Sequence, residues 1–224
     1  MVDPTISRVL ADRIPNARLA QIGEEDDSAD TGWWHWYGRG DAILREIGVL
    51  LEDVRRQDVV FDRVLATVLF TDIVDSTERA AALGDQAWKD VVERHHALVR
   101  EHLAAYRGSE IDTAGDGFYA TFDGPARAAT CATSIVAAVR ALGIEVRAGL
   151  HTGEVATVAG KSGGIAVVIG SRVAAMAGPS EVLATQTVRD LTAGSGLTFE
   201  DAGEHELKGV PDRWHLYRVA GGPA

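Results

Sequence analysis

Two apolar segments that each lead into an aspartate constrain this chain more than any other feature. Residues 65–77 read LATVLFTDIVDST, and residues 111–121 read IDTAGDGFYAT. Apolar runs bounded by turn residues predict β-strands, with Asp72 at the end of one strand and Asp116 in the turn of a hairpin. Mg²⁺ and Mn²⁺ prefer such carboxylates, often together with substrate phosphates. The pattern predicts a divalent-cation site for phosphate chemistry, although two ordinary turn aspartates would give the same spacing.

Composition restricts the class of protein. With 22 basic and 33 acidic residues among 224, the net charge of −11 argues against non-specific binding to nucleic acid or to an anionic membrane. Cys131 is the only cysteine, which excludes an intrachain disulfide and a cysteine-based zinc site. No apolar run reaches transmembrane length and no signal-peptide pattern begins the chain. These features predict a soluble, cytoplasmic protein without a membrane or nucleic-acid partner.

The first 60 residues differ from the rest and are predicted to form a separate appendage. They contain an acidic loop, an aromatic cluster at residues 32–37 with three of the five tryptophans, and an amphipathic helix that begins at Asp41. The segment is too small to bury these aromatics alone. It is expected to dock on the main domain at residues 61–220, on a partner subunit, or on a missing neighbour.

The main domain alternates strand and helix patterns, which predicts α/β layers with a largely antiparallel sheet. A strand and two helices precede a hairpin at 109–122, and a helix covers 125–142. A second hairpin is predicted around Thr152–Gly153, followed by a helix that ends at Gly178–Pro179, a strand, a helix and edge strands. His95 and His96 are adjacent and point to different helix faces, so they are assigned surface or packing roles rather than metal binding.

Residues 64–219 resemble the class III nucleotidyl cyclase homology domain. The matching stretches are VLFTDIVDSTERAAALGD, GSEIDTAGDGFYATFDGPARA, VRAGLHTGEV, GGIAVVIGSRVAAMAGPSEVLAT and HELKGVPDRWHLYRV, in the family's order. The resemblance implies a ferredoxin-like βαββαβ core and a head-to-tail homodimer with composite active sites. It also implies conversion of ATP or GTP to a cyclic nucleotide and pyrophosphate with two Mg²⁺ or Mn²⁺ ions per site.

Several site residues follow from the resemblance, position by position. Asp72 and Asp116 match the metal-binding carboxylates, and the Ile73 carbonyl would complete the metal shell. Arg172 matches the arginine that stabilises charge at the α-phosphate, and Lys208 matches a lysine that binds the terminal phosphates. The turn that opens the next helix offers backbone N–H groups to phosphate oxygens from Val74, Asp75, Ser76 and Thr77.

Four positions depart from the family pattern. Asp75 replaces a frequent glycine, and it either weakens nucleotide binding or caps the helix. Asp112 stands where adenylyl cyclases place a base-reading lysine, and Lys161, or Gly160 after a one-residue shift, stands where they place an aspartate. This swapped pair either still bonds adenine or forms a salt bridge that fills the pocket. Val168 replaces an Asn or His that orients the ribose, and it can neither donate nor accept a hydrogen bond.

Two functions remain open at this point. The first is a weak or atypical cyclase that uses ATP in preference to GTP. The second is a degenerate domain that binds nucleotide or metal, or that serves as a dimerisation or regulatory module, without turnover. Through ADRIPNARL, the acidic loop with its aromatic cluster, and DAILREI, the N-terminal segment resembles the tail of an α/β-hydrolase domain that some actinobacterial proteins carry ahead of a cyclase domain. His35 falls where such a domain keeps its triad histidine, and it would be a vestige here because the chain has no G-x-S-x-G nucleophile motif.

Overall fold

The computed structural model describes residues 63–158 and 161–222, together with Val9, Arg13, Arg45 and residues 47–49. The chain divides into two units, Met1–Phe61 and Asp62–Ala224, and the fold below is that of the second unit. The predicted appendage, with its aromatic cluster and the helix expected from Asp41, lies outside the described residues apart from those few positions.

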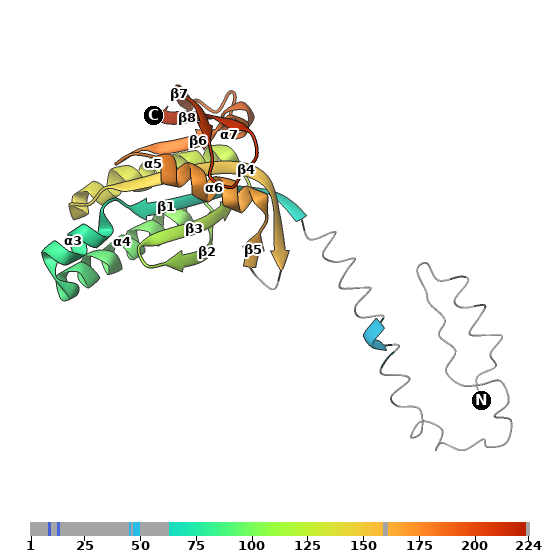
Figure 1. Cartoon of the computed structure of the whole chain (residues 1–224), viewed down its shortest axis with the longest axis horizontal. Coiled ribbons are helices and arrows are strands. Elements are labelled where there is room, and N and C mark those ends of the chain that lie inside the picture. Colours follow the sequence, from blue (N-terminus) through green and yellow to red (C-terminus); the bar gives the residue numbers. More distant parts are fainter. Residues whose placement is uncertain are drawn as a thin grey trace, which may run out of the picture. The chain divides into compact units, whose positions relative to one another are not determined.

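One mixed sheet organises the described domain (Figure 1). Its strands are β1 (Arg63–Ile73), β2 (Ser109–Ala114), β3 (Gly117–Phe122), β4 (Val146–Val158), β5 (Lys161–Gly163), β6 (Val182–Thr185), β7 (Thr198–Glu206) and β8 (Arg213–Gly221). The order is β2-β3-β1-β4-β6-β8-β7, and β5 pairs with β4 off this path. Only the β4–β6 pairing is parallel among the described strands. The predicted mixed fold with a mostly antiparallel sheet is confirmed.

Helices cover both faces of this sheet. They are α3 (Ser76–Leu83), α4 (Asp85–Ala105), α5 (Pro125–Ala138), the 3₁₀ turn η2 (Val139–Leu142), α6 (Ile165–Met176) and α7 (Gln186–Leu191). Alternation along β1 assigns the faces: Leu69 and Ile73 pack with α4 and α5, whereas Val68 packs on the other face with Ala166 of α6. Each helix in the described part of the chain is too short or too polar to span a bilayer.

The second predicted hairpin is wrong. Thr152 and Gly153 lie inside β4, which pairs with β1 from Val146 to Ala156, and the hydroxyl groups of Thr152 and Thr67 are hydrogen-bonded across the strands at 2.9 Å. A Cβ on Gly153 would lie 3.0 Å from the Cβ of Ala166, so this glycine makes room for α6 rather than forming a turn. The chain reverses later, where β4 pairs with β5.

Candidate active site

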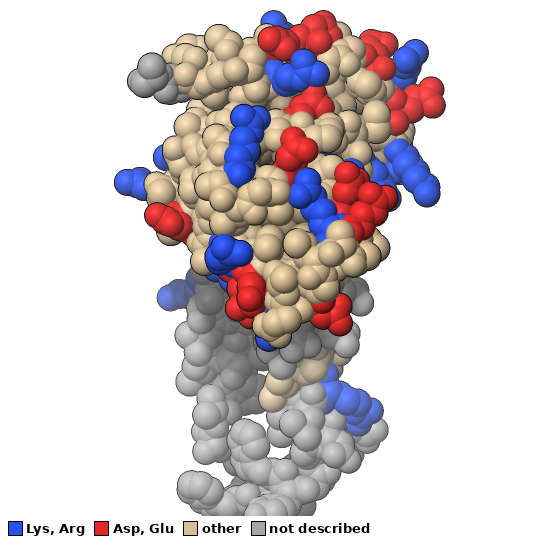
Figure 2. All heavy atoms as spheres, turned by 90° about the vertical axis from the view of Figure 1, so that its left-hand side faces the viewer, with Lys and Arg blue, Asp and Glu red and all other residues tan. Residues whose placement is uncertain are grey.

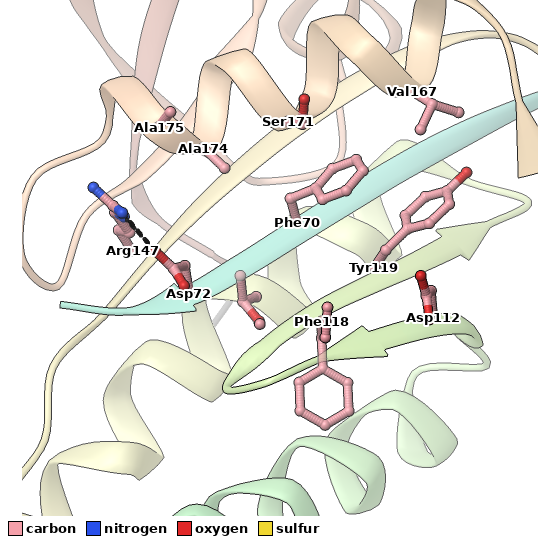
Figure 3. Close-up of a pocket in the computed structure, with 13 residues that line it drawn as sticks. Phe70, Asp72, Asp112, Phe118, Tyr119, Arg147, Val167, Ser171, Ala174 and Ala175 are labelled. Atoms are coloured by element: carbon pink, nitrogen blue, oxygen red, sulfur yellow. Dashed lines mark hydrogen bonds and ion pairs between the residues drawn. The ribbon is translucent and has the colours of Figure 1, made fainter. Parts of the chain in front are cut away.

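A cavity of about 490 Å³ lies between α6 and strands β1 to β4 (Figure 3). Its wall takes residues from each of these elements: Phe70 and Asp72 from β1, Asp112 from β2, Tyr119 from β3, Arg147 from β4, and Val167, Ser171, Ala174 and Ala175 from α6. Asp72 reaches this side because it alternates with the core residues Leu69 and Ile73. The cavity therefore joins a carboxylate, a guanidinium and an aromatic wall from separate parts of the chain.

Asp72 is held by an arginine that the sequence analysis did not identify. Arg147 lies directly opposite Asp72 in the β1–β4 register, and its Nη2 and Nε donate to the Oδ2 atom at 2.5 and 3.1 Å. Both side chains are more than one-third exposed, so water screens this ion pair. The bonds leave Asp72 Oδ1 available for another ligand.

Asp116 occupies the turn between β2 and β3, as the sequence predicted. Its Oδ2 is buried and has no hydrogen-bond partner among the described residues. A Cβ built on the next residue, Gly117, would lie 3.8 Å from Asp72 Oδ1, so the exit of the turn adjoins Asp72. A buried carboxylate oxygen without a donor is costly unless a cation or water satisfies it.

These residues fit a hard divalent cation that retains water or substrate oxygens. Within the described ranges there is no cluster of three or more Asp, Glu, His or Cys side chains that would bind a metal without such added ligands. Mg²⁺ commonly binds through one or two carboxylates plus phosphates, which matches Asp72 and Asp116. Ile73 ends β1 and is buried as a whole residue, and its hydrocarbon side chain has no atom that binds a metal, so only its backbone carbonyl is a possible ligand.

A bulge in the β2–β3 pairing directs Asp112 into the cavity. The register shifts between Glu110 and Asp112, which breaks the two-residue alternation of a regular strand. Glu110 bonds Arg100 of α4, whereas Asp112 lines the cavity on the opposite face. Nearby, the rings of Phe70 and Tyr119 stack with centroids 4.6 Å apart and form an apolar wall. A flat aromatic base would find both a wall and a carboxylate here.

The turn before α3 offers fewer free N–H groups than predicted. The Val74 N–H donates to the Glu145 carbonyl at 2.9 Å and is already used. Ser76 and Thr77 begin α3, where N–H groups lack partners within the helix. Asp75 occupies the N-cap position with φ 55° but makes no side-chain capping bond, so the capping interpretation is wrong.

Four other predicted residues, Asp116, Val168, Arg172 and Lys208, are not among the residues that line the cavity. Arg172 donates from Nε to the Lys208 carbonyl at 3.1 Å, and this contact brings the two predicted phosphate-binding residues together. Neither of them lines the cavity, although Ser171 does. Val168 is one helical turn before Arg172 on the same face of α6 and is 38% exposed. Lys161 begins β5, and its side chain lies outside the described ones, as does Gly160.

Two histidines are buried and neutral near neutral pH. Burial, followed by the nearby His96, lowers the pKa of His95 to about 4. Burial alone lowers the pKa of His151 to about 4, and its Nδ1 lies 2.9 Å from the Thr185 hydroxyl. Neither ring lines the cavity, so the structure gives both a packing role.

Charges on the face seen in Figure 2 are interspersed rather than collected by sign. In the described chain as a whole, Arg100 pairs with Glu110, and Arg218 pairs with Glu181 and Glu200. This face therefore offers no broad positive surface for a polyanion.

The chain belongs to the adenylate and guanylate cyclase catalytic domain family, whose model matches residues 61–221. It is similar to the crystal structure of the adenylyl cyclase CyaB from Pseudomonas aeruginosa, with a TM-score of 0.65, 22% identity, and 72% of this chain and 96% of that one covered. It is also similar to the guanylate cyclase domain of RhGC from Catenaria anguillulae in complex with GTP, with a TM-score of 0.65, 18% identity, and 71% and 97% covered. At these identities the structures show a shared fold.

Curated relatives are longer than this chain. The uncharacterized protein Rv2212 of Mycobacterium tuberculosis (strain H37Rv) is 27% identical over 192 residues, which are 79% of this chain and 50% of that protein. The uncharacterized protein R02095 of Rhizobium meliloti is 25% identical over 182 residues, which are 71% of this chain and 18% of that protein. The chain thus spans half or less of the length of these relatives.

Proposed function

We propose that this chain is a purine nucleotidyl cyclase that converts ATP, or GTP less readily, to a 3′,5′-cyclic nucleotide and pyrophosphate. One observation carries the proposal: the buried Asp116 Oδ2 without a partner lies on a turn that adjoins Asp72 at the edge of a large cavity. Membership of the cyclase family gives this pair of carboxylates its chemical context.

Asp72, Asp116 and the Ile73 carbonyl would hold two Mg²⁺ or Mn²⁺ ions. Such ions lower the pKa of a ribose hydroxyl and neutralise the triphosphate and the leaving pyrophosphate. Arg147 holds Asp72 through Oδ2, which orients the carboxylate. Its guanidinium also lines the cavity, where it supplies positive charge next to the phosphates.

Asp112 and the Phe70–Tyr119 wall would bind the purine base. A carboxylate accepts hydrogen bonds and cannot donate them. Guanine presents two adjacent donors to it, whereas adenine presents a donor beside an acceptor. The preference for ATP therefore depends on Lys161 as the donor to the acceptor of adenine. We therefore expect Lys161→Ala to shift the preference towards GTP.

The active site would be completed by a second copy of the chain. Arg172 and Lys208 lie together outside the cavity that contains Asp72, so within one chain they do not share a pocket with it. In a head-to-tail homodimer, these two cations would face the carboxylates of the partner subunit. Arg172 would then stabilise charge at the α-phosphate with its two-pronged guanidinium.

The test is production of cyclic AMP and cyclic GMP by the purified chain with Mn²⁺, compared with Asp72→Ala. We expect product from the wild type and at least a hundredfold less, on the order of one lost transition-state contact, from the variant. Product that persists in Asp72→Ala would rule out the metal mechanism. No product from either nucleotide would rule out the enzyme.

A second candidate is a degenerate cyclase domain that binds nucleotide without turnover. The exposed Val168, one turn from Arg172, favours it because an apolar side chain cannot orient a ribose by hydrogen bonding. Binding of Mn²⁺ and ATP without product would support this function.

A further inference from the structure

Helix α4 packs against the β2–β3 hairpin, which carries both Asp112 and Asp116. Phe118, two residues after Asp116, is 3% exposed and points away from Phe70 and Tyr119 towards the helices (Figure 3). His95 and His96 present their rings edge-on to Phe118, with centroids 5.7 and 5.1 Å away. Arg100 lies over the same ring at 5.5 Å. Three side chains of one helix thus enclose a single residue of β3.

The same helix also holds the other strand. Arg100 donates two hydrogen bonds of 2.8 Å to Glu110 of β2, and the Thr113 hydroxyl donates to Glu110 at 2.6 Å. The Arg100 hydrogen bonds, followed by that of Thr113, lower the pKa of Glu110 to about 2. The hairpin is therefore fixed to α4 through both of its strands.

One contact reaches the turn itself. His96 Nε2 lies 3.0 Å from the carbonyl oxygen of Gly115, with the ring nitrogen as donor. That carbonyl belongs to the peptide bond that leads into Asp116, and Gly115 has φ +62°, a left-handed conformation that most residues avoid. The sheet pairing ends at Ala114 and Gly117, so the ladder does not fix this peptide. The hydrogen bond from the His96 imidazole restrains this peptide group, which no backbone hydrogen bond of the β2–β3 pairing does.

We propose that His96 is a positioning residue for Asp116, and that it sets the affinity of the metal site. The inference rests on the proposed function, because it takes Asp116 to be a metal ligand. His96 holds the Gly115 peptide plane, and the plane sets the direction in which the Asp116 carboxylate leaves the turn. Outer groups that orient a metal ligand typically change metal affinity by about 10- to 100-fold.

The experiment is a Mn²⁺ titration of the full chain, followed by the paramagnetic resonance signal of free Mn²⁺. The variants are His96→Ala, His96→Gln, His102→Ala and Asp116→Asn. His102 lies on the same helix but bonds the carbonyl of Leu98 instead of the hairpin, so it is the matched control. Thermal unfolding of every variant separates loss of the site from loss of the fold.

We expect His96→Ala to weaken Mn²⁺ binding about tenfold, the lower end of effects on such orienting groups, with a melting temperature close to that of His102→Ala. His96→Gln keeps an N–H donor and should recover most of the affinity. Wild-type affinity in His96→Ala, with binding lost in Asp116→Asn, would overturn the inference and leave the proposed function intact. Equal weakening in His96→Ala and His102→Ala would also overturn it. Wild-type affinity in Asp116→Asn would instead overturn the proposed metal site, and the inference with it.

Discussion

The hairpin side of the domain and the outer face of α6 differ in how many of their contacts one chain supplies. On the hairpin side, Phe118 is enclosed by α4 and the Gly115 carbonyl is bonded by His96. On the outer face of α6, Ile165, Val168 and Met176 are 56%, 38% and 45% exposed. On the hairpin side, a single chain supplies the contacts that enclose these residues. The outer face of α6 instead presents apolar side chains and Arg172 to the outside. Metal binding should therefore need one chain, and turnover should need two.

The largest expected effect is on the pH dependence of stability, and it tests whether His95, which packs against the hairpin, is shielded from water. The His95 ring stays neutral in the folded chain until its pKa of about 4, whereas an ordinary histidine gains a proton near 6.5. The unfolded state therefore binds more protons between these values, so stability falls as the pH drops through this window, by up to about 3 kcal/mol. Urea unfolding across this range should show the loss in wild type and a smaller one in His95→Leu, where His151 still contributes. Identical pH dependence in both would mean that water reaches this ring.

Arg172→Ala tests the open face. We expect kcat to fall about a hundredfold, or about 2.7 kcal/mol, because a charge-stabilising contact is lost. Mixing this variant with Asp72→Ala should restore activity, since a mixed dimer of the proposed kind would retain one intact site. Random pairing in a symmetric dimer predicts recovery to about a quarter of wild type. An inactive mixture would contradict composite sites.

Val168→Asn should raise the rate, since asparagine restores a hydrogen-bonding group one turn from Arg172. We expect a gain of about tenfold in kcat, smaller than the cost of removing a complete charged contact. Ile165→Asn is the control, because Ile165 lies on the same exposed face one turn earlier. Equal rates in the two variants would show that polarity of this face, rather than position 168, controls turnover.

The smallest effect concerns the Arg100–Glu110 pair. The pKa of Glu110 is lowered from 4.5 to about 2, so the pair stabilises the fold fully above pH 4.5 and loses this contribution as the pH falls towards 2. Because Arg100 is half exposed, Glu110→Gln should cost only about 1 kcal/mol or less at neutral pH. Chemical unfolding measures it against Glu93→Gln, whose carboxylate pairs with Lys89 on the exposed side of α4. An equal loss of unfolding free energy in both variants would contradict a role for the Arg100–Glu110 pair in holding the hairpin against α4.

Local patterns predicted most of the fold. The hairpin that carries Asp116 was predicted because its turn residues and flanking apolar runs lie within a few positions of each other. The false hairpin at Thr152–Gly153 arose because that glycine serves packing against α6, which depends on a helix later in the chain. Tertiary contacts override a local turn signal at this point.

The site was predictable only in part, for the same reason. Asp72 and Asp116 lie in short motifs and Asp112 is indicated by the family resemblance, whereas Arg147 acts through a β1–β4 register that joins residues 75 positions apart. His96 was assigned to surface or packing, and nothing in its neighbours along the chain indicates that its partner is the Gly115 carbonyl. No glycine or proline marks the bulge between Glu110 and Asp112.

That bulge makes the pairing register of β2 with β3, and not only residue type, a determinant of what the cavity can recognise. If β2 paired with β3 without this register shift, Glu110 and Asp112, which are two residues apart, would point to a single face. Either Arg100 would lose its partner or the cavity would lose its acid. A shift of the bulge along this edge strand would thus change base recognition, whereas deletion of Ile111 alone would leave the two carboxylates adjacent and on opposite faces. Homologous chains could diverge in substrate choice by this route without any substitution in the cavity wall.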